Sequence, residues 1–551
     1  MKKTLIVVLL IALSAVSNIA LGSVATEDTM TVKKQLAKFA PVNVELPSKL
    51  LTARQKKLVD ELVAAAKIMD QIFLRQVYEE NAVLEDELKK NSNKAPYVYE
   101  YFTINFGPFD RLNHNEPFVK GVGAKPAGAT FYPTDMTKKE FTNWLKKHPS
   151  DREAFESNFT VIRRDGKSLK AIPYSQQYAE LLTKAADHLN KAAKLATNKT
   201  LKKYLKSRAK AFLSNDYYES DVDWVRLKDH AIEVVIGPYE VYEDNLFGYK
   251  AAFEAFVTRV DPAESKRLAK VVAYLDDLEK NLPIDDKYKG IGRSLSSPIV
   301  VAQLIYSAGD TKAGVQTLAF NLPNDERIRE QEGSKKVMLK NVQKAKFEKI
   351  LVPIAQKLMN KDDAADVDFE AFFAHTLLHE VSHGIGPGKI NKGGEETTVN
   401  KELKELYSVI EECKADTLSA YNAVYLTDKG LYPKNFLVNA WPTYLAGLFR
   451  SVRFGISEAH GGSNAIQFNY LLEKGAITYD ENTWLFGVNR AKIQQAITDL
   501  ASDLLLIEAQ GDYDAAKSFV KKYRTTPASL KAGLEKLSDV PVDIKPIYAY
   551  K

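Results

Sequence analysis

Hydrophobic residues recur at helical spacing through most of the chain. Helices are predicted over residues 29–88, which include an amphipathic run from Leu51 to Phe73, and again over residues 176–215. From Asp366 onward the pattern is mainly helical. These stretches predict a protein in which helix predominates.

β-Branched and aromatic residues cluster in several shorter stretches, which predict strands. The predicted strands are residues 96–107, 159–174, the region of Val234 and Val235, 255–260 and 312–321. Arg164 to Lys167, with the sequence RDGK, predicts a hairpin turn inside the second of them. Pro262 and the helix expected after it indicate a boundary, and residues 336–359 are predicted to be helical.

Together these elements predict an α+β fold that is mostly helical, with two lobes and a cleft between them. One lobe is helical, and the other mixes helices with a small β-barrel or sheet built from separated strands. The expected segments are 23–260 in the mixed lobe, 261–300 in the helical lobe, 301–355 back in the mixed lobe, 356–510 in the helical lobe and 511–551 as a C-terminal segment. Ligands usually bind in such clefts.

The most informative stretch is Phe369 to Gly388, FEAFFAHTLLHEVSHGIGPG. It places His379 and His383 in an H-E-x-x-H pattern, and two histidines four residues apart lie on one face of a helix. One metal ion can therefore reach both imidazoles. Glu380 is placed to take a proton from a water molecule whose pKa zinc lowers. A buried helix with two hydrogen-bonded histidines is the alternative, because short motifs also arise by chance.

A third ligand is expected from the predicted helix over Leu403 to Tyr425, which contains Glu411, Glu412 and Asp416. Glu412 and Asp416 are four residues apart and share a face. The first is predicted to bind the metal, and the second to accept an N–H from a ligand histidine. Glu411 is expected to support the site in the same way, or else to lie on a solvated helix face.

Two other side chains are weaker candidates for the metal. His375 lies one turn before His379, but it is eight residues from His383, about 12 Å along a helix. It is therefore predicted to be a core residue or to support a ligand. Cys413 points about 100° away from Glu412 and has no partner cysteine, so it is expected to be a small buried residue.

These two helices resemble those of the dipeptidyl peptidase III family of zinc metallopeptidases, and further stretches match that family in the same chain order. The matching stretches are 236–248 (IGPYEVYEDNLFG), 321–330 (NLPNDERIRE), 458–460 (EAH) and 471–475 (LLEKG). The resemblance covers the chain from about residue 155 to residue 475. It implies the two-lobed fold, one zinc ion per chain, and an active site in the cleft.

The resemblance also implies two catalytic residues beside Glu380. His460 corresponds to a family histidine that contacts the substrate near the metal, where an imidazole can donate to a developing oxyanion. Tyr242 corresponds to a tyrosine that helps to polarise the scissile carbonyl. The alternatives are an isolated histidine without a catalytic role and a buried core tyrosine.

Three further residues correspond to family positions that hold the free amino terminus of the peptide. These are Glu240, Asn321 and Asn324. A carboxylate suits an ammonium group, and asparagine amides suit a peptide backbone. Because Asn321 is at the end of a predicted strand, the substrate is expected to pair there as an added strand. The alternative is turn chemistry around Pro323, which asparagine also favours.

Two features depart from the best-known members of the family. This chain has five residues in its first motif, where they have six in the form H-E-x-x-x-H, and five residues fit an undistorted helix. Only 29 residues separate His383 from Glu412 (412 − 383 = 29). A loop of the longer relatives is therefore trimmed, which bears on the length of substrate that the cleft accepts.

Composition excludes some classes of protein. A chain of 551 residues with 45% hydrophobic and 27% charged residues is ordinary for globular domains with full cores. The net charge is +6, but no dense basic tract with interleaved aromatic residues is present, so nucleic-acid binding is not expected. With Cys413 as the only cysteine, no intrachain disulfide can form.

Met1 to Gly22, MKKTLIVVLLIALSAVSNIALG, is predicted to be a secretory signal peptide that is cleaved after residues 20–22. A membrane anchor is the alternative, but the apolar run is shorter than the roughly 20 residues that a span needs. The expected location is the bacterial periplasm, with no membrane span after removal of the signal.

The expected function is a zinc exopeptidase that removes dipeptides from the amino terminus of short peptides. The second interpretation is a zinc aminopeptidase or oligopeptidase with another cleavage preference. The third is a peptide-binding protein with a structural zinc ion, which the lack of a suitable fourth cysteine ligand disfavours. The oligomeric state stays open.

Overall fold

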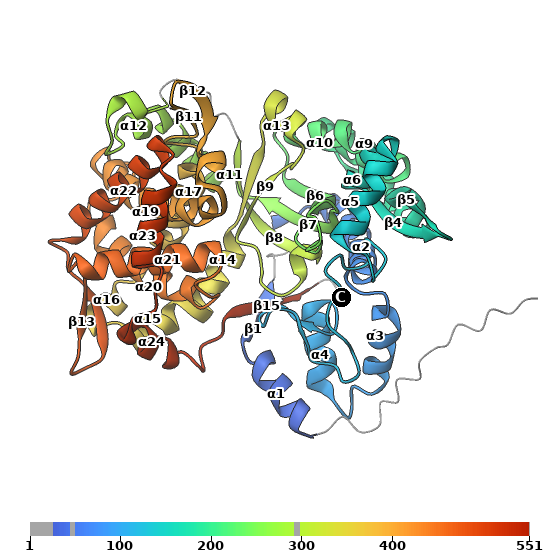
Figure 1. Ribbon diagram of the computed structural model, residues 1–551, viewed down its shortest axis with the longest axis horizontal. Helices are drawn as coiled ribbons and strands as arrows, with labels where there is room; N and C mark the ends of the chain where they lie inside the picture. The colour runs from blue at the N-terminus through green and yellow to red at the C-terminus, as the bar shows by residue number, and fades with distance from the viewer. Residues whose placement is uncertain (1–25, 45–49, 291–297, 550–551) are drawn as a thin grey trace, which may run out of the picture.

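The structure is a computed structural model that describes residues 26–44, 50–290 and 298–549. Figure 1 shows a helical lobe, drawn mostly in orange and red, beside a lobe in which helices surround a sheet. The prediction of a mostly helical α+β fold with two lobes is confirmed. The predicted signal peptide, residues 1–22, lies outside the described residues. In the described part of the chain, no helix combines the length and the apolar character needed to cross a bilayer.

A five-stranded sheet forms the centre of the mixed lobe, with the strand order β6-β7-β8-β10-β9. Its strands are β6 (Ile232–Glu240), β7 (Ala252–Val260), β8 (Ile299–Gly309), β9 (Ala319–Leu322) and β10 (Lys335–Leu339). Neighbouring strands are antiparallel except β8 and β10, which are parallel. The sheet is open, with β6 and β9 at its edges, so of the two predicted forms the structure has the sheet and not the barrel.

The central strands are apolar on both faces because helices cover the sheet. Helix α2 (Ala53–Val77) packs against β7 and β8, and α8 (Ala179–Leu195) packs between α2 and α9 (Lys199–Ser214). The N-terminus of α2 is fixed by a capping box, in which the Thr52 hydroxyl accepts from the Gln55 N–H and the Gln55 side chain accepts from the Thr52 N–H. The helices predicted over residues 53–77 and 176–215 are therefore confirmed, but within the helical prediction for residues 29–88 the segment 39–44 is wrong, because it forms strand β1 (Phe39–Val44) and pairs with the last strand of the chain.

The helical lobe is built around two helices that pack along each other, α17 and α19. Its main helices are α17 (Phe369–Ser382), α19 (Tyr407–Asp428), α20 (Phe436–Val452), α21 (Ala459–Glu473) and α22 (Ile493–Gln510). Helix α19 contacts the other four. As a result every residue from Cys413 to Ala420 is buried, including the charged ones. This places the predicted carboxylates of α19 inside the lobe rather than on its surface.

The two ends of the described chain lie side by side. Strand β15 (Asp543–Tyr548) pairs in parallel with β1 (Phe39–Val44), red beside blue in Figure 1. The pairing buries Asp543, whose carboxylate forms an ion pair of 2.8 Å with Lys346. The C-terminal segment therefore contributes a charge to the region between the lobes.

The predicted hairpin is confirmed. Strands β4 (Thr160–Asp165) and β5 (Ser168–Pro173) are antiparallel, with Asp165 opposite Ser168. Gly166 turns the chain between them at a φ of +60°, a conformation that glycine adopts without strain. The strands predicted near Val234 and at residues 255–260 are the central parts of β6 and β7.

The strand predicted over residues 96–107 is wrong, because residues 96–105 form helix α4 (Pro96–Asn105). Its aromatic and β-branched residues favour a strand locally, but Pro96 occupies the first helical turn, where its missing N–H has no partner to lose. Tertiary packing favours the helix over the strand here, because the residues that are buried follow helical spacing. They are Val98, Tyr101, Phe102, Ile104 and Asn105.

Three boundaries around the sheet also differ from the predictions. Of the strand predicted over 312–321, only residues 319–321 lie in β9, which ends at Leu322. The helix predicted over 336–359 starts instead with β10, and helix begins at α14 (Lys340–Lys346). Strand β8 was not predicted. Strands buried on both faces lack the alternation that marks a half-buried strand, and short apolar runs of this kind resemble helix segments.

Alanine substitutions at two glycines would show how closely the backbone packs at the end of β8. Gly309 ends β8 at a φ of +67°, and a Cβ there would lie 2.1 Å from the backbone oxygen of Phe253. Gly309→Ala is expected to lower the free energy of unfolding by roughly 3 kcal/mol, from backbone strain of about 1–2 kcal/mol plus overpacking. Gly166→Ala has the same backbone strain, but the space around its Cβ is open. It is therefore expected to lower the free energy of unfolding by roughly 1 kcal/mol. Thermal unfolding measures both, and equal shifts would contradict the close approach at Gly309.

Candidate metal centre

Helix α17 presents the two motif histidines to the same point. Asp368 caps its N-terminus by accepting from the Ala371 N–H, and the apolar residues before the motif bury the helix against α19 and α20. His379 and His383 are one turn apart, and their Nε2 atoms lie 3.1 Å from each other. This distance is too short for two N–H groups pointing at each other, so at least one Nε2 presents a lone pair here.

Glu412 approaches the histidines from α19. Its Oε2 lies 3.4 Å from His379 Nε2 and 3.8 Å from His383 Nε2. The three atoms fall within 4.8 Å of one another, the spacing of ligands that share one ion. Oε2 is also buried without a hydrogen bond of good geometry, although His460 Nδ1 lies 3.2 Å away. An orphaned buried carboxylate oxygen beside two imidazole nitrogens fits a bound divalent metal ion.

Two carboxylates hold the far sides of the histidine rings. Asp416 Oδ1 lies 2.7 Å from His379 Nδ1, and Glu411 Oε1 lies 2.8 Å from His383 Nδ1. Each carboxylate accepts the N–H of its ring, so Nε2 of both rings is left free to bind a metal. Burial lowers the pKa of His379, but the charge of Asp416 outweighs it and raises that pKa to about 9.

Asp416 is itself held by a second helix. Its Oδ2 accepts from Asn464 at 2.9 Å, from Gln467 at 3.1 Å and from Ser463 at 3.3 Å, all on α21. These three residues were not predicted. Their signal in the sequence is a polar face, at helical spacing, on a helix that is otherwise apolar and buried.

Glu380 points to the same centre from α17. Its carboxylate lies 3.3 Å from the Nζ of Lys336 on β10, and that Nζ also donates to the Glu380 carbonyl. Burial opposes ionisation of Glu380, but Lys336 and the two motif histidines lower its pKa below the ordinary value. The carboxylate is therefore ionised and can accept a proton. Lys336 was not predicted, because only the sheet brings it to the helix.

The two weaker metal candidates lie outside the ligand group. His375 contacts Ser419 through Nδ1, and its Nε2 lies 3.6 Å from Asp416 Oδ1. It therefore supports the carboxylate behind His379, as predicted. Cys413 is fully buried in the core between α19 and its neighbours, also as predicted.

His379, Glu380 and Asp416 of the metal centre line one side of a cavity of about 330 Å³. Residues 315–319, which lead into β9, form another wall, and residues 447–454 at the end of α20 close it. His460 lies at its edge and is 62% exposed. The cavity thus lies between the helical lobe and the edge strand of the sheet, where the predicted cleft was expected.

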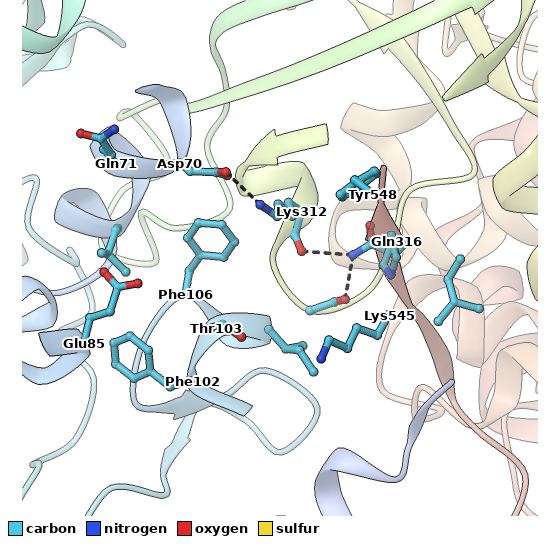
Figure 2. Close-up of a pocket in the computed structure, with 15 residues that line it drawn as sticks. Asp70, Gln71, Glu85, Phe102, Thr103, Phe106, Lys312, Gln316, Lys545 and Tyr548 are labelled. Atoms are coloured by element: carbon cyan, nitrogen blue, oxygen red, sulfur yellow. Dashed lines mark hydrogen bonds and ion pairs between the residues drawn. The ribbon is translucent and has the colours of Figure 1, made fainter. Parts of the chain in front are cut away.

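A second cavity, of about 350 Å³, shares Gln316 with the first (Figure 2). Its walls are mostly apolar and include Phe102 and Phe106, and Lys312 is paired there with Asp70 at 2.8 Å. None of the predicted site residues lines it. The chemistry therefore belongs to the cavity at the metal centre, although the second cavity is as large.

The residues predicted to bind the peptide lie at the other end of β9. Asn324 follows β9 and donates to the Tyr239 carbonyl at 3.0 Å, beside Glu240 at the end of β6. Asn321 lies on the edge strand, and its Oδ1 is buried without a partner. None of the three lines the metal cavity, so the structure groups them as a separate cluster. Burial raises the pKa of Glu240, with Asn324 opposing the shift.

Tyr242 follows β6, two residues after Glu240. It is 76% exposed, so the alternative of a core tyrosine is wrong. The charge of Glu240 and then burial raise the pKa of its hydroxyl, and the charge of Glu412 adds to the shift. Tyr242 does not line the metal cavity.

Comparison with known proteins agrees with this arrangement. The chain matches the model of peptidase family M49 over residues 134–417, more than half of its length. The solved structure of DPP III from Caldithrix abyssi superposes with a TM-score of 0.93 at 57% identity, covering 94% of this chain and 99% of that one.

Two relatives among characterised proteins differ in how much of their length matches this chain. Nudix hydrolase 3 of Arabidopsis thaliana is 42% identical over 575 residues, which cover 94% of this chain and 74% of the plant protein. Dipeptidyl peptidase 3 of Mus musculus is 28% identical over 381 residues, which cover 62% of this chain and 46% of the mouse protein. The match therefore spans about half the length of the mouse relative. The family match, the superposition and the grouped side chains lead to one conclusion: the chain belongs to peptidase family M49 and is a metallopeptidase that acts on peptides.

Proposed function

We propose that the protein is a zinc-dependent exopeptidase that releases dipeptides from the amino terminus of short peptides. The observation that carries the proposal is the convergence of His379, His383 and Glu412 within 4.8 Å, with Glu380 beside them. Two imidazoles and one carboxylate are a common ligand set of catalytic zinc and leave one position open. When bound, zinc supplies a Lewis acid that activates water and polarises a carbonyl.

The chain's own groups supply the proton transfers and the hydrogen bonds. Glu380 takes the proton of the attacking water on its carboxylate and delivers it to the leaving amine. His460 lies 3.2 Å from the Glu412 carboxylate, which raises the pKa of His460 although burial opposes the shift. A protonated imidazole at that position donates to the oxygen on which negative charge develops. Tyr242, two residues after the end of β6 and exposed, is the second donor.

The cut position follows from where the peptide is held. Glu240 ends β6, where Asn324 donates to the neighbouring Tyr239 carbonyl. A carboxylate at this acidic end of the cleft suits a free ammonium group. Asn321 lies on an unpaired sheet edge, so an extended peptide can add as a strand. A peptide anchored there presents one particular bond to the metal centre.

The anchoring predicts an effect of blocking the amino terminus. Acetylation removes the ammonium charge, and is expected to lower kcat/KM at least about tenfold, the equivalent of about 1.4 kcal/mol. Glu240→Gln should weaken turnover of free peptides and leave that of acetylated peptides unchanged. Rates and product masses for matched free and acetylated peptides provide the measurement.

The control for this prediction is Glu326→Gln, which changes an exposed carboxylate at the start of the helix after Asn324. It is expected to leave both peptides unaffected. If acetylated and free peptides are cut equally fast, or the products are not dipeptides, the exopeptidase proposal fails, and a zinc oligopeptidase becomes the better description.

Zinc content tests the metal itself. Metal analysis of the purified protein should find about one zinc ion per chain, as expected for one group of three ligands. Export to the bacterial periplasm is part of the proposal and depends on the sequence of residues 1–22. Amino-terminal sequencing of the protein from the periplasmic fraction should then start after Gly22.

A further inference from the structure

One buried cation in the metal cavity has no partner. Arg450, in the last turn of α20, is 8% exposed and lines the cavity together with His379 and Glu380. Its Nε is buried without a hydrogen bond, and among the described residues its guanidinium makes no hydrogen bond or ion pair. Its nearest ring is Phe454, 5.5 Å from the guanidinium carbon. Burying an arginine without a partner is unfavourable, so the residue requires an explanation other than stability.

The charge around Arg450 is unbalanced. Lys346 lines the same cavity, and Arg453 lies one turn further on. Within residues 26–44, 50–290 and 298–549, the one carboxylate paired with either of these cations is Asp543, at 2.8 Å from Lys346. Asp543 also accepts from the backbone N–H groups of Gln316 and Ile544, so its oxygens are occupied. One end of the cleft therefore carries an excess of positive charge.

The pKa shifts agree with a missing anion. Burial lowers the pKa of Arg450, with Asp543 opposing the shift. Burial lowers the pKa of Lys346 to about 8, and the charge of Arg450 contributes to the shift although Asp543 opposes it. A bound anion between the two side chains would remove this penalty, because an opposite charge favours the charged form of both.

The basic end lies opposite the acidic end of the cleft. Arg450 lines the cavity beside residues 315–319, whereas Asn321 and Asn324 are further along the same stretch of chain. From Gln316 to Asn321 is five residues, at most roughly 17 Å of extended chain. A peptide that runs antiparallel to β9, with its first residue beside Asn321, therefore directs its other end toward Arg450 within about five residues.

We propose that Arg450 binds a carboxylate of the substrate on the far side of the cleaved bond, in the first instance the C-terminal carboxylate of a peptide of about five residues. This deepens the proposed function and rests on it. A guanidinium presents two parallel N–H groups that match a carboxylate, and the bond is charge-assisted in a site shielded from water. The cleft then recognises both ends of a short peptide, which makes short peptides with free termini its substrate class.

The first test compares three pentapeptides that differ only at the C-terminus. They are a free acid, the corresponding amide, and an amide whose last residue is glutamate. The zinc-loaded full chain is expected to cut the free acid at least about tenfold faster, in kcat/KM, than the plain amide. If the glutamyl amide recovers the rate, the carboxylate can also come from a side chain. If it does not, the terminus alone is recognised. Equal rates for the acid and the plain amide would overturn the proposal.

Two arginine variants separate binding from structure. Arg450→Met should abolish the preference for the acid while leaving the rate for the amide within about twofold, and should leave the melting temperature unchanged or raise it, since it removes a buried unpaired charge. Arg450→Lys should retain part of the preference. The matched control is Arg453→Met, because Arg453 donates to the carbonyls of Val540 and Pro541 and does not line the cavity. It should lower the melting temperature and keep the preference.

A binding measurement keeps this inference separate from the cleavage reaction. In a Glu380→Gln background the pentapeptides are not turned over, and calorimetry of the zinc-loaded protein gives their Kd values directly. The acid is expected to bind at least about tenfold more tightly than the amide, and adding Arg450→Met should remove the difference. If the difference persists in the double variant, Arg450 is not the receptor. If the affinity difference disappears in the double variant but the products of the active enzyme are not dipeptides, the proposed cleavage position is wrong, whereas the assignment of Arg450 as the carboxylate-binding residue is supported.

Discussion

Replacing Glu380 with glutamine is expected to lower kcat by about a thousandfold and to leave zinc content unchanged. Glutamine keeps the shape of the side chain but cannot take a proton, and general-base catalysis typically contributes 10²–10⁴-fold. Zinc binding should not change, because the Glu380 carboxylate contacts Lys336 and is not one of the three converging ligand groups. Peptide turnover and metal analysis on the same preparation measure the two effects.

The control for this prediction lies on the same helix. Glu370 starts α17, is paired with Arg267 at 2.7 Å, and is 46% exposed. Glu370→Gln makes the same chemical change away from the cavity, so it should alter kcat by no more than about twofold. Retention of more than a tenth of the wild-type kcat by the Glu380 variant would assign the proton transfer to another group.

Local spacing was enough to predict the core of the metal site. Two histidines four residues apart must share a helix face, and the same holds for Glu412 and Asp416. The structure adds that Asp416 and Glu411 each hold one histidine ring, at 2.7 and 2.8 Å. These contacts lie between two helices, but each partner is set by its position within its own helix. For that reason a sequence can reveal them.

The residues that the sequence could not reveal depend on the packing of distant segments. Lys336 reaches Glu380 only because β10 lies beside α17, and Asp543 reaches Lys346 only because the last strand pairs with the first. Arg450 carries no motif at all, and its significance is the lack of a partner in a buried place. Such information is absent from the spacing of residues along one helix.

The errors in the fold have the same origin. In α4 the local preference of aromatic residues for strands is overridden by the face that packs into the core. In β8 and β10 the strands are covered on both sides, so alternation is lost. Helices α8, α9, α17 and α19 could be predicted because the helical spacing of their residues is preserved over several turns.

Removal of Glu412 is expected to weaken zinc binding by more than a hundredfold. Loss of a supporting hydrogen bond, as in Asp416→Asn, typically costs 10–100-fold in metal affinity, and loss of one of three ligands should exceed that. Zinc affinity is therefore expected to fall in the order wild type, Asp416→Asn, Glu412→Ala. Competition with a chelator of known affinity gives all three Kd values. An Asp416 variant that loses more zinc than the Glu412 variant would move the third ligand from Glu412 to another side chain.

Thermal unfolding distinguishes a ligand from a residue that only supports the fold. In the metal-free protein Glu412 Oε2 lies within 3.8 Å of a nitrogen of His379, of His383 and of His460, so Glu412→Ala should lower the metal-free melting temperature modestly by removing these contacts. A ligand that binds only the folded state stabilises it by RT ln(1 + [L]/Kd), about 2.7 kcal/mol at a hundredfold excess over Kd. Zinc should therefore raise the melting temperature of the wild type and have little effect on the Glu412 variant at the same concentration. Equal zinc-induced shifts in the two proteins would show that the ion binds elsewhere.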